Sequence, residues 1–89
     1  MEWKIEIRPI AVKELNKLDP QAAKRILGFL HTRLSPLDNP RSIGEVLSGP
    51  LGAFWKYRVG DYRIICDIRD NTVTVLVLAI GNRKEVYRR

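Results

Sequence analysis

Three strand-like segments, at residues 54–59, 62–69 and 72–80, constrain the fold of this chain more than any other feature. The first two alternate in side-chain character with a period of two, which is typical of β-strands. Pairs of turn residues that close tight hairpins, Gly60-Asp61 and Asp70-Asn71, separate the three segments. The third segment is apolar on both faces and is therefore expected at the centre of a sheet. Together they predict an antiparallel meander.

The first third of the chain predicts one more strand and two helices. Residues 3–8 alternate with a period of two, and this strand ends at Pro9. The period then becomes helical, with apolar residues at Ala11, Leu15 and Leu18. Asp19-Pro20 supplies an N-cap and a first-turn proline for a second helix. The apolar face of that helix consists of Ala23, Ile26, Leu27, Leu30 and Leu34.

Residues 35–53 contain three prolines and three glycines and predict a loop, with a short edge strand at 45–47. The predicted class is therefore α+β with the element order β-α-α-β-β-β. A two-helix hairpin packs on one face of a small, mainly antiparallel, twisted sheet. At 89 residues, the chain is long enough for a single domain, 1–89, and too short for a second.

The composition excludes several function classes. One cysteine and one histidine rule out a disulfide framework and argue against a zinc site, so no metal and no cofactor are expected. Cys66 lies on an apolar strand face and is expected to be a buried packing residue. No apolar run approaches the ~18–20 residues of a membrane span, and the first residues are not a signal peptide. We expect a soluble, cytoplasmic protein without a membrane partner.

The chain is basic, and the basic residues are unevenly distributed. The formal net charge is +6, which favours an anionic partner. Residues 56–89 carry eight Lys and Arg against four Asp and Glu, whereas residues 1–55 carry eight against six. Six of the eight basic residues in the later segment are arginines, whose planar guanidinium matches a phosphate.

The predicted strand pairing brings several of these charges together. A two-residue turn places Arg58 directly opposite Arg63, with their Cβ atoms ~4.5–5.5 Å apart. Like charges at that separation destabilise a sheet, and a bound anion would remove the conflict. The third strand of the meander returns antiparallel beside Arg63 and brings the C-terminal segment with it. The candidate site therefore consists of Lys56, Arg58, Arg63, Arg83 and Tyr87.

The element order, the segment 55–65 (WKYRVGDYRII) and the ending 80–88 (IGNRKEVYR) resemble the RelE branch of the RelE/ParE toxin superfamily. The resemblance implies a toxin of a type II toxin–antitoxin system. Such toxins are ribosome-dependent endoribonucleases that cut messenger RNA in the A site by attack of a 2′-hydroxyl, without a metal. The expected partners are an acidic antitoxin that wraps the toxin, the ribosome with its mRNA, and operator DNA only through the toxin–antitoxin complex.

The resemblance also implies a role for each candidate residue. Lys56 would stabilise charge on the scissile phosphate, and Arg63 would bind phosphate. Arg83 would stabilise or protonate the leaving 5′-oxygen, and Tyr87 would stack on a base or help to activate the 2′-hydroxyl. Arg58 matches a second basic position that is lysine in some members. Further RNA contacts are expected from Lys84, Arg88 and Arg89.

The sequence departs from the family pattern at two positions. A lysine among cations can act as a base, but Arg58 cannot lose its proton and is an electrostatic residue. The general base is then Tyr87, Lys56, or a group of the RNA or ribosome. Some members also carry an arginine in the loop before the hairpin, where this chain has Ser48.

Two other functions share these features in part. One is a ParE-like toxin that inhibits DNA gyrase, and the other is a non-catalytic nucleic-acid-binding module. ParE-like members generally lack the clustered Lys and Arg with a terminal tyrosine, and a simple binding module needs no converging Tyr87. The sequence therefore favours the RNA-cleaving toxin.

Overall fold

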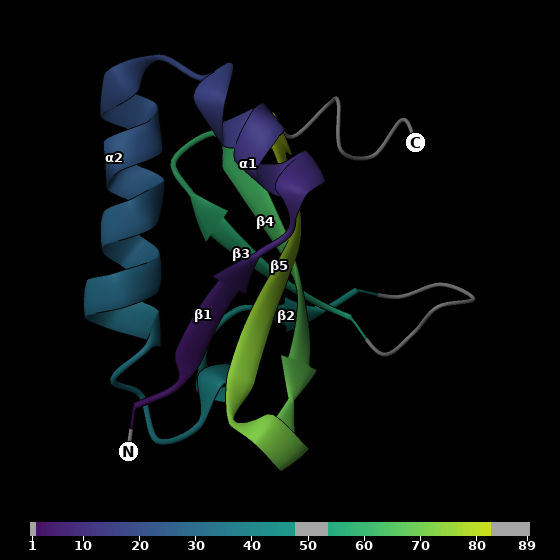
Figure 1. Ribbon diagram of the computed structural model, residues 1–89. Coiled ribbons are helices and arrows are strands. Elements are labelled where there is room, and N and C mark those ends of the chain that lie inside the picture. The colour runs from purple at the N-terminus through teal and green to yellow at the C-terminus, as the bar shows by residue number, and fades with distance from the viewer. Residues whose placement is uncertain (1, 48–53, 83–89) are drawn as a thin grey trace.

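The structure is a computed structural model that describes residues 2–47 and 54–82. Within these residues, five strands form one sheet in the order β1-β5-β4-β3-β2, and two helices pack on one face (Figure 1). The elements are β1 (Lys4–Ile7), α1 (Pro9–Asn16), α2 (Pro20–Gly28), β2 (Glu45–Val46), β3 (Trp55–Val59), β4 (Tyr62–Arg69) and β5 (Thr74–Asn82). β1 pairs with β5 in parallel, and the other pairs are antiparallel. This confirms the predicted α+β class and element order.

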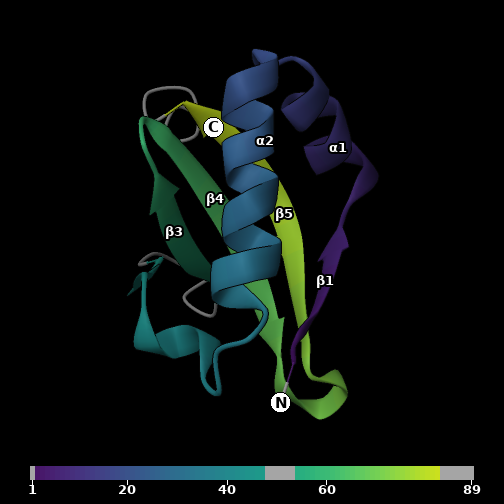
Figure 2. The ribbon, with the colours of Figure 1, turned by 90° about the vertical axis from the view of Figure 1, so that its left-hand side faces the viewer.

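The second helix begins at the predicted cap and lies across the sheet. The Asp19 carboxylate accepts hydrogen bonds from the backbone N–H groups of Gln21 and Ala22, at 2.8 and 3.2 Å. After Gly28 the chain continues as a π-helical segment, Phe29–Leu34. Figure 2 shows α2 crossing in front of β4 and β5, with α1 and β1 on one side and β3 on the other. This position leaves one long side of α2 facing the β3 edge of the sheet.

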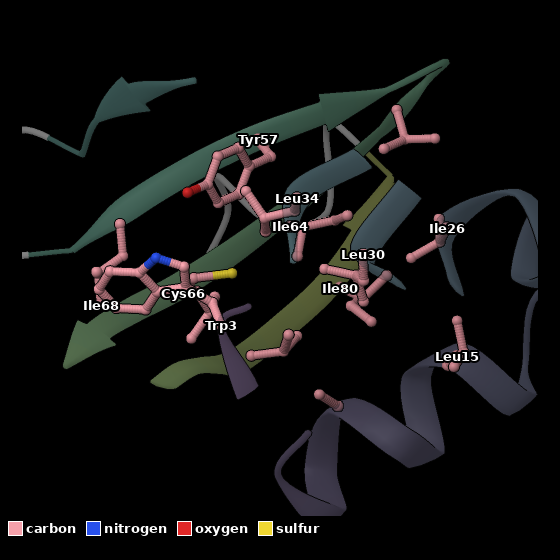
Figure 3. Packing of buried hydrophobic residues seen from close by; sticks show 14 residues of the cluster. Trp3, Leu15, Ile26, Leu30, Leu34, Tyr57, Ile64, Cys66, Ile68 and Ile80 are labelled. Carbon is pink, nitrogen blue, oxygen red and sulfur yellow. The ribbon is translucent and has the colours of Figure 1, made fainter. Parts of the chain in front are cut away.

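The core lies between the helices and the sheet. Ile26, Leu30 and Leu34 are completely buried, as their helical spacing predicted. They face Tyr57 on β3 and Cys66 on β4, which point from the sheet into the same cluster (Figure 3). In β3 and β4, the side chains that enter this cluster alternate with side chains on the opposite face of the sheet.

The connection between β4 and β5 differs from the prediction. Instead of a two-residue turn at Asp70-Asn71, a 3-10 turn, Asp70–Thr72, is followed by Val73 in the left-handed region with φ of 49°. Consequently β5 begins two residues later than predicted and extends to Asn82. A β-branched residue seldom adopts this backbone conformation, so the sequence carries no local signal for it. The Arg41 guanidinium donates to both carboxylate oxygens of Asp70, at 3.0 and 2.9 Å. This contact holds the turn against the loop that precedes β2.

A register shift in β5 also escaped the sequence analysis. Ile65 pairs with Ala79 and Cys66 with Val77, so Leu78 is an extra residue in β5. Such a bulge changes which side chains face the core. Val77 and Ile80 are therefore both buried in the core cluster although they are three residues apart.

Candidate functional site

The β3–β4 hairpin carries three of the predicted site residues. Val59 pairs with Tyr62, and Arg58 pairs with Arg63, as the two-residue turn predicted. Gly60 has φ of 59°, in the left-handed region that this tight turn requires. The two arginines lie on the sheet face that is opposite to the buried Tyr57 and Ile64. The hairpin therefore places two arginines at directly opposed positions of a sheet face that the helices do not cover.

Lys56 extends this cluster by two residues along β3. Its Nζ lies 3.5 Å from Oε2 of Glu45, which is its direct neighbour on β2. The Lys56 side chain is 19% exposed, whereas that of Glu45 is 73% exposed. The lysine is thus held against the sheet, while the carboxylate is free to move into solvent.

These three residues line a cavity of about 850 Å³ at the edge of the sheet. Within the described part of the chain, β2 pairs only with Trp55 and Lys56, so the remainder of β3 forms the sheet edge. Side chains from both faces of β3 reach the cavity around this edge. Its other wall is α2 with the π-helical segment. The residues of that wall are Arg25, Phe29, Thr32 and Arg33.

Sequence analysis missed Arg25 and Arg33 as site residues. With Phe29 they are spaced i, i+4 and i+8, which places all three on one face of a helix. That spacing could have grouped them. It could not show that this face looks across to β3, because the distance between a helix and a strand is a property of the tertiary packing.

The remaining predicted residues follow the end of β5. Asn82 pairs with Tyr62 and Gly81 with Arg63, so β5 ends beside the arginine pair, as expected. The Glu14 carboxylate on α1 accepts a hydrogen bond of 3.0 Å from the backbone N–H of Ile80 and fixes this end of the strand. The other predicted site residues, Arg83, Lys84, Tyr87, Arg88 and Arg89, lie outside the described residues.

Two buried groups near the hairpin are packing residues. Cys66 is completely buried, and burial raises the pKa of its thiol, so the nucleophilic thiolate is disfavoured. Burial also raises the pKa of Tyr57, whose hydroxyl donates a 2.7 Å hydrogen bond to the carbonyl of Pro40. The phenol of Tyr57 anchors the loop that precedes β2. Neither group is placed to act as a base or nucleophile in the cavity.

The described residues limit what else the site can hold. Among residues 2–47 and 54–82, no group of three or more His, Cys, Asp or Glu side chains is arranged to bind a metal ion. In the same ranges, no helix is long and apolar enough to cross a membrane. Basic groups therefore dominate the chemistry of the cavity, with Glu45 as the one carboxylate that lines it.

Comparison with known protein families shows which family this chain belongs to. Residues 5–87 match the family model for the ParE toxin of type II toxin–antitoxin systems, parDE. The chain belongs to the RelE/ParE toxin superfamily. The match covers nearly the whole chain and includes both helices and the complete β3–β4 hairpin. The chain is therefore a toxin of the type II class, as the sequence resemblance implied.

Individual relatives narrow the assignment to the RelE branch. Toxin RelG of Mycobacterium tuberculosis is 29% identical over 89 residues, and the match covers 100% of both chains. The crystal structure of the toxin–antitoxin complex RelBE2 from the same organism matches with a TM-score of 0.84 at 26% identity, covering 93% of each chain. The archaeal RelE–RelB complex from Pyrococcus horikoshii matches with a TM-score of 0.74 at 26% identity, covering 93% and 97%. The sequence relatives and the structures with the same fold both indicate a toxin of the RelE type.

Proposed function

We propose that this RelE-type toxin is a ribosome-dependent endoribonuclease that cleaves messenger RNA in the ribosomal A site without a metal or cofactor. The observation that carries the proposal is the direct opposition of Arg58 and Arg63, with Lys56 in the same cavity. Opposed like charges are unfavourable for the sheet itself. A phosphate that binds between them turns this repulsion into attraction.

The cluster has the groups that phosphate-ester cleavage needs. As the RNA 2′-oxygen forms its bond to phosphorus, negative charge increases on the phosphate oxygens, and positioned cations stabilise it. The 2′-hydroxyl gives its proton to the general base, which is Tyr87, Lys56, or a group of the RNA or ribosome. As the bond to the 5′-oxygen breaks, a proton returns to that oxygen, leaving a cyclic phosphate and a 5′-hydroxyl. Lys56 and Arg63 stabilise the pentacovalent phosphate, and Arg58 adds charge without acting as a base. The ribosome supplies the in-line orientation of the RNA.

The C-terminal residues complete this proposed site. Arg83 would stabilise charge on the leaving 5′-oxygen, and Tyr87 would stack on a base or help to activate the 2′-hydroxyl. Lys84, Arg88 and Arg89 would contact the RNA. The end of β5 at Asn82, opposite Tyr62, supports this assignment because it starts the segment beside the hairpin.

The proposed resting partner is an acidic antitoxin that wraps the toxin. RelE-type neighbours were solved as complexes with RelB, and the basic cavity suits an acidic chain. In this proposal the toxin contacts operator DNA only as part of the antitoxin complex. Release of the antitoxin frees the cavity for RNA in the cytoplasm.

A matched pair of variants on β4 tests the enzymatic proposal. Arg63→Ala removes a cavity cation, whereas Arg69→Ala removes an exposed arginine of the same strand that is paired with Asp67 at 3.2 Å. After induction, primer extension on a translated message should show cleavage within codons for the native toxin and for Arg69→Ala. Arg63→Ala should reduce the cleavage at least 100-fold, because one removed transition-state donor costs about that factor.

The same assay decides between the alternatives. Cleavage that persists undiminished in Arg63→Ala contradicts the assignment of the site. The matching family model bears the ParE name, which favours gyrase inhibition as the second candidate. Gyrase-linked DNA breaks without mRNA cleavage would establish that activity instead. Neither effect would leave a non-catalytic binding module.

A further inference from the structure

The α2 wall of the cavity, which consists of Arg25, Phe29, Thr32 and Arg33, carries two arginines. Arg25 and Arg33 are exposed, and within the described residues neither guanidinium has a carboxylate within 4 Å. By contrast, Arg41 and Arg69, away from the cavity, pair with Asp70 and Asp67. Arg41 and Arg69 are thus paired within the fold, whereas the two arginines of the α2 wall have no carboxylate partner among the described residues.

The positive charge of Arg25 lies close to the β3–β4 hairpin. A Cβ atom added to Gly60 would lie 3.5 Å from Nη1 of Arg25, so the guanidinium of Arg25 lies over the β3–β4 turn. Arg33 lies eight residues further along the chain, about two helical turns away, in the π-helical segment that continues α2. The two charges therefore mark the two ends of the α2 wall.

Phe29 fixes the α2 wall relative to β3. It lies between the two arginines in sequence, and its ring centroid is 5.7 Å from that of Tyr57. The Tyr57 phenol is itself tied to the carbonyl of Pro40. The spacing between the arginines of α2 and the cations of the hairpin is thus set by packed rings and does not depend on exposed side chains.

We propose that Arg25 and Arg33 bind the phosphates that flank the phosphate held by Lys56, Arg58 and Arg63, so that α2 and the hairpin form the two walls of a single-stranded RNA groove. This inference rests on the proposed function. A stacked strand advances about 3.4 Å for each nucleotide, so the α2 wall spans about three nucleotides. A cavity of about 850 Å³ is large enough for a short single strand.

The test uses RNA that cannot be cleaved, so that binding is measured apart from catalysis. Fully 2′-O-methylated oligonucleotides of one to eight nucleotides are titrated into the full-length toxin at several NaCl concentrations. The variant is Arg25→Ala/Arg33→Ala. The control is Lys17→Ala/Lys24→Ala, which removes two exposed helical cations that do not line the cavity and gives the same net charge.

The two-wall groove gives a defined result. For oligonucleotides of four or more residues, the arginine variant should lower the slope of log K against log salt by about 1.4, or 0.7 for each lost phosphate contact. A single nucleotide monophosphate should bind both variants equally, because it reaches only the hairpin. Equal slopes for the arginine variant and the control, or no measurable binding by the native toxin, would overturn the inference.

Two further measurements separate this inference from the proposed function and from a protein partner. Codon cleavage by the native toxin on ribosomes, together with equal slopes, rejects the α2 wall and leaves the proposed function standing. An Asp- and Glu-rich peptide of the same charge as the RNA serves as the competing ligand. A larger loss of affinity for that peptide than for RNA would assign Arg25 and Arg33 to a protein partner and reject the RNA groove.

Discussion

Gly44 is the residue at which the shape of the cavity depends most on a single backbone conformation. It has φ of 80° and precedes β2. A Cβ atom there would lie 2.5 Å from the carbonyl oxygen of Lys56 and 2.7 Å from Nε1 of Trp55. The indole Nε1–H of Trp55 donates a 2.7 Å hydrogen bond to the carbonyl of Ile43, which holds this side chain beside Gly44. Only glycine allows β2 to approach β3 so closely.

We therefore expect Gly44→Ala to lower the free energy of unfolding by roughly 2–4 kcal/mol, from the strained φ and the overpacking together. Gly28→Ala is the matched control, because no atom lies within 4 Å of its added Cβ and its backbone is helical. That change should stabilise the protein by up to about 1 kcal/mol. Urea unfolding of both variants measures the difference, and equal stabilities would contradict the argument.

Single-residue features were the most predictable part of the site. The period of two placed Lys56, Arg58 and Arg63 on one face of the hairpin, because side-chain direction in a strand follows directly from position. Arg25 and Arg33 were not predictable in the same way. A helical stripe gives their common face, but only the packing of Phe29 on Tyr57 determines what that face meets.

At the scale of elements, α1 holds the C-terminal end of β5 in place. β1 pairs with β5 only as far as Val77, so the later N–H groups on that edge need another acceptor. The Glu14 carboxylate provides one for Ile80, at 3.0 Å. Ile80 is 1% exposed, and an unsatisfied N–H at such a position is unfavourable.

Glu14→Ala should lower the free energy of unfolding by about 1–3 kcal/mol, the cost of a buried donor without an acceptor. Glu14→Gln keeps an acceptor oxygen and should cost less than about 1 kcal/mol. Amide hydrogen exchange gives the local readout, because the Ile80 N–H should exchange at least tenfold faster in the alanine variant alone. Unchanged protection of Ile80 in Glu14→Ala would show that this contact does not hold the strand.

The elements also show where sequence patterns fail. The two helices and the four longer strands were predicted, because each has several residues that repeat its period. The change to a π-helix at Phe29–Leu34 was not predicted, because this segment was expected to continue the second helix. The prediction of the β4–β5 turn was wrong because Val73 takes a left-handed conformation that is normally associated with glycine. The extra residue at Leu78 was missed because β5 is apolar on both faces, and its alternation therefore gives no register. Tertiary contacts, such as Arg41 with Asp70, decide these points.

At the scale of the whole molecule, basic side chains line the surface cavity, whereas two titratable side chains, Tyr57 and Cys66, lie in the core. Stability depends on pH, because the core contains the Cys66 thiol and the Tyr57 phenol. Burial raises the pKa of each group, since the charged form is poorly solvated there.

The sign of this dependence follows from proton linkage. A group whose pKa is higher in the folded state stabilises the fold fully below its unfolded pKa, and this stabilisation is lost as the pH rises. The unfolded pKa values are about 8.5 for cysteine and about 10 for tyrosine. The loss therefore begins near pH 8.5 with Cys66, and Tyr57 adds to it above about pH 10.

We expect the free energy of unfolding to fall by about 1.4 kcal/mol for each pH unit between about pH 9 and 10, because the unfolded chain loses the cysteine proton while the folded chain keeps it. In Cys66→Ala, this slope should disappear below about pH 10, whatever the stability of the variant at neutral pH. Tyr57→Phe should keep the first slope and reduce the second. Urea unfolding from pH 7 to 11 measures all three curves. If native and Cys66→Ala curves are parallel between pH 9 and 10, the thiol is accessible to water in the folded toxin, and the proposed packing of β4 against α2 is wrong.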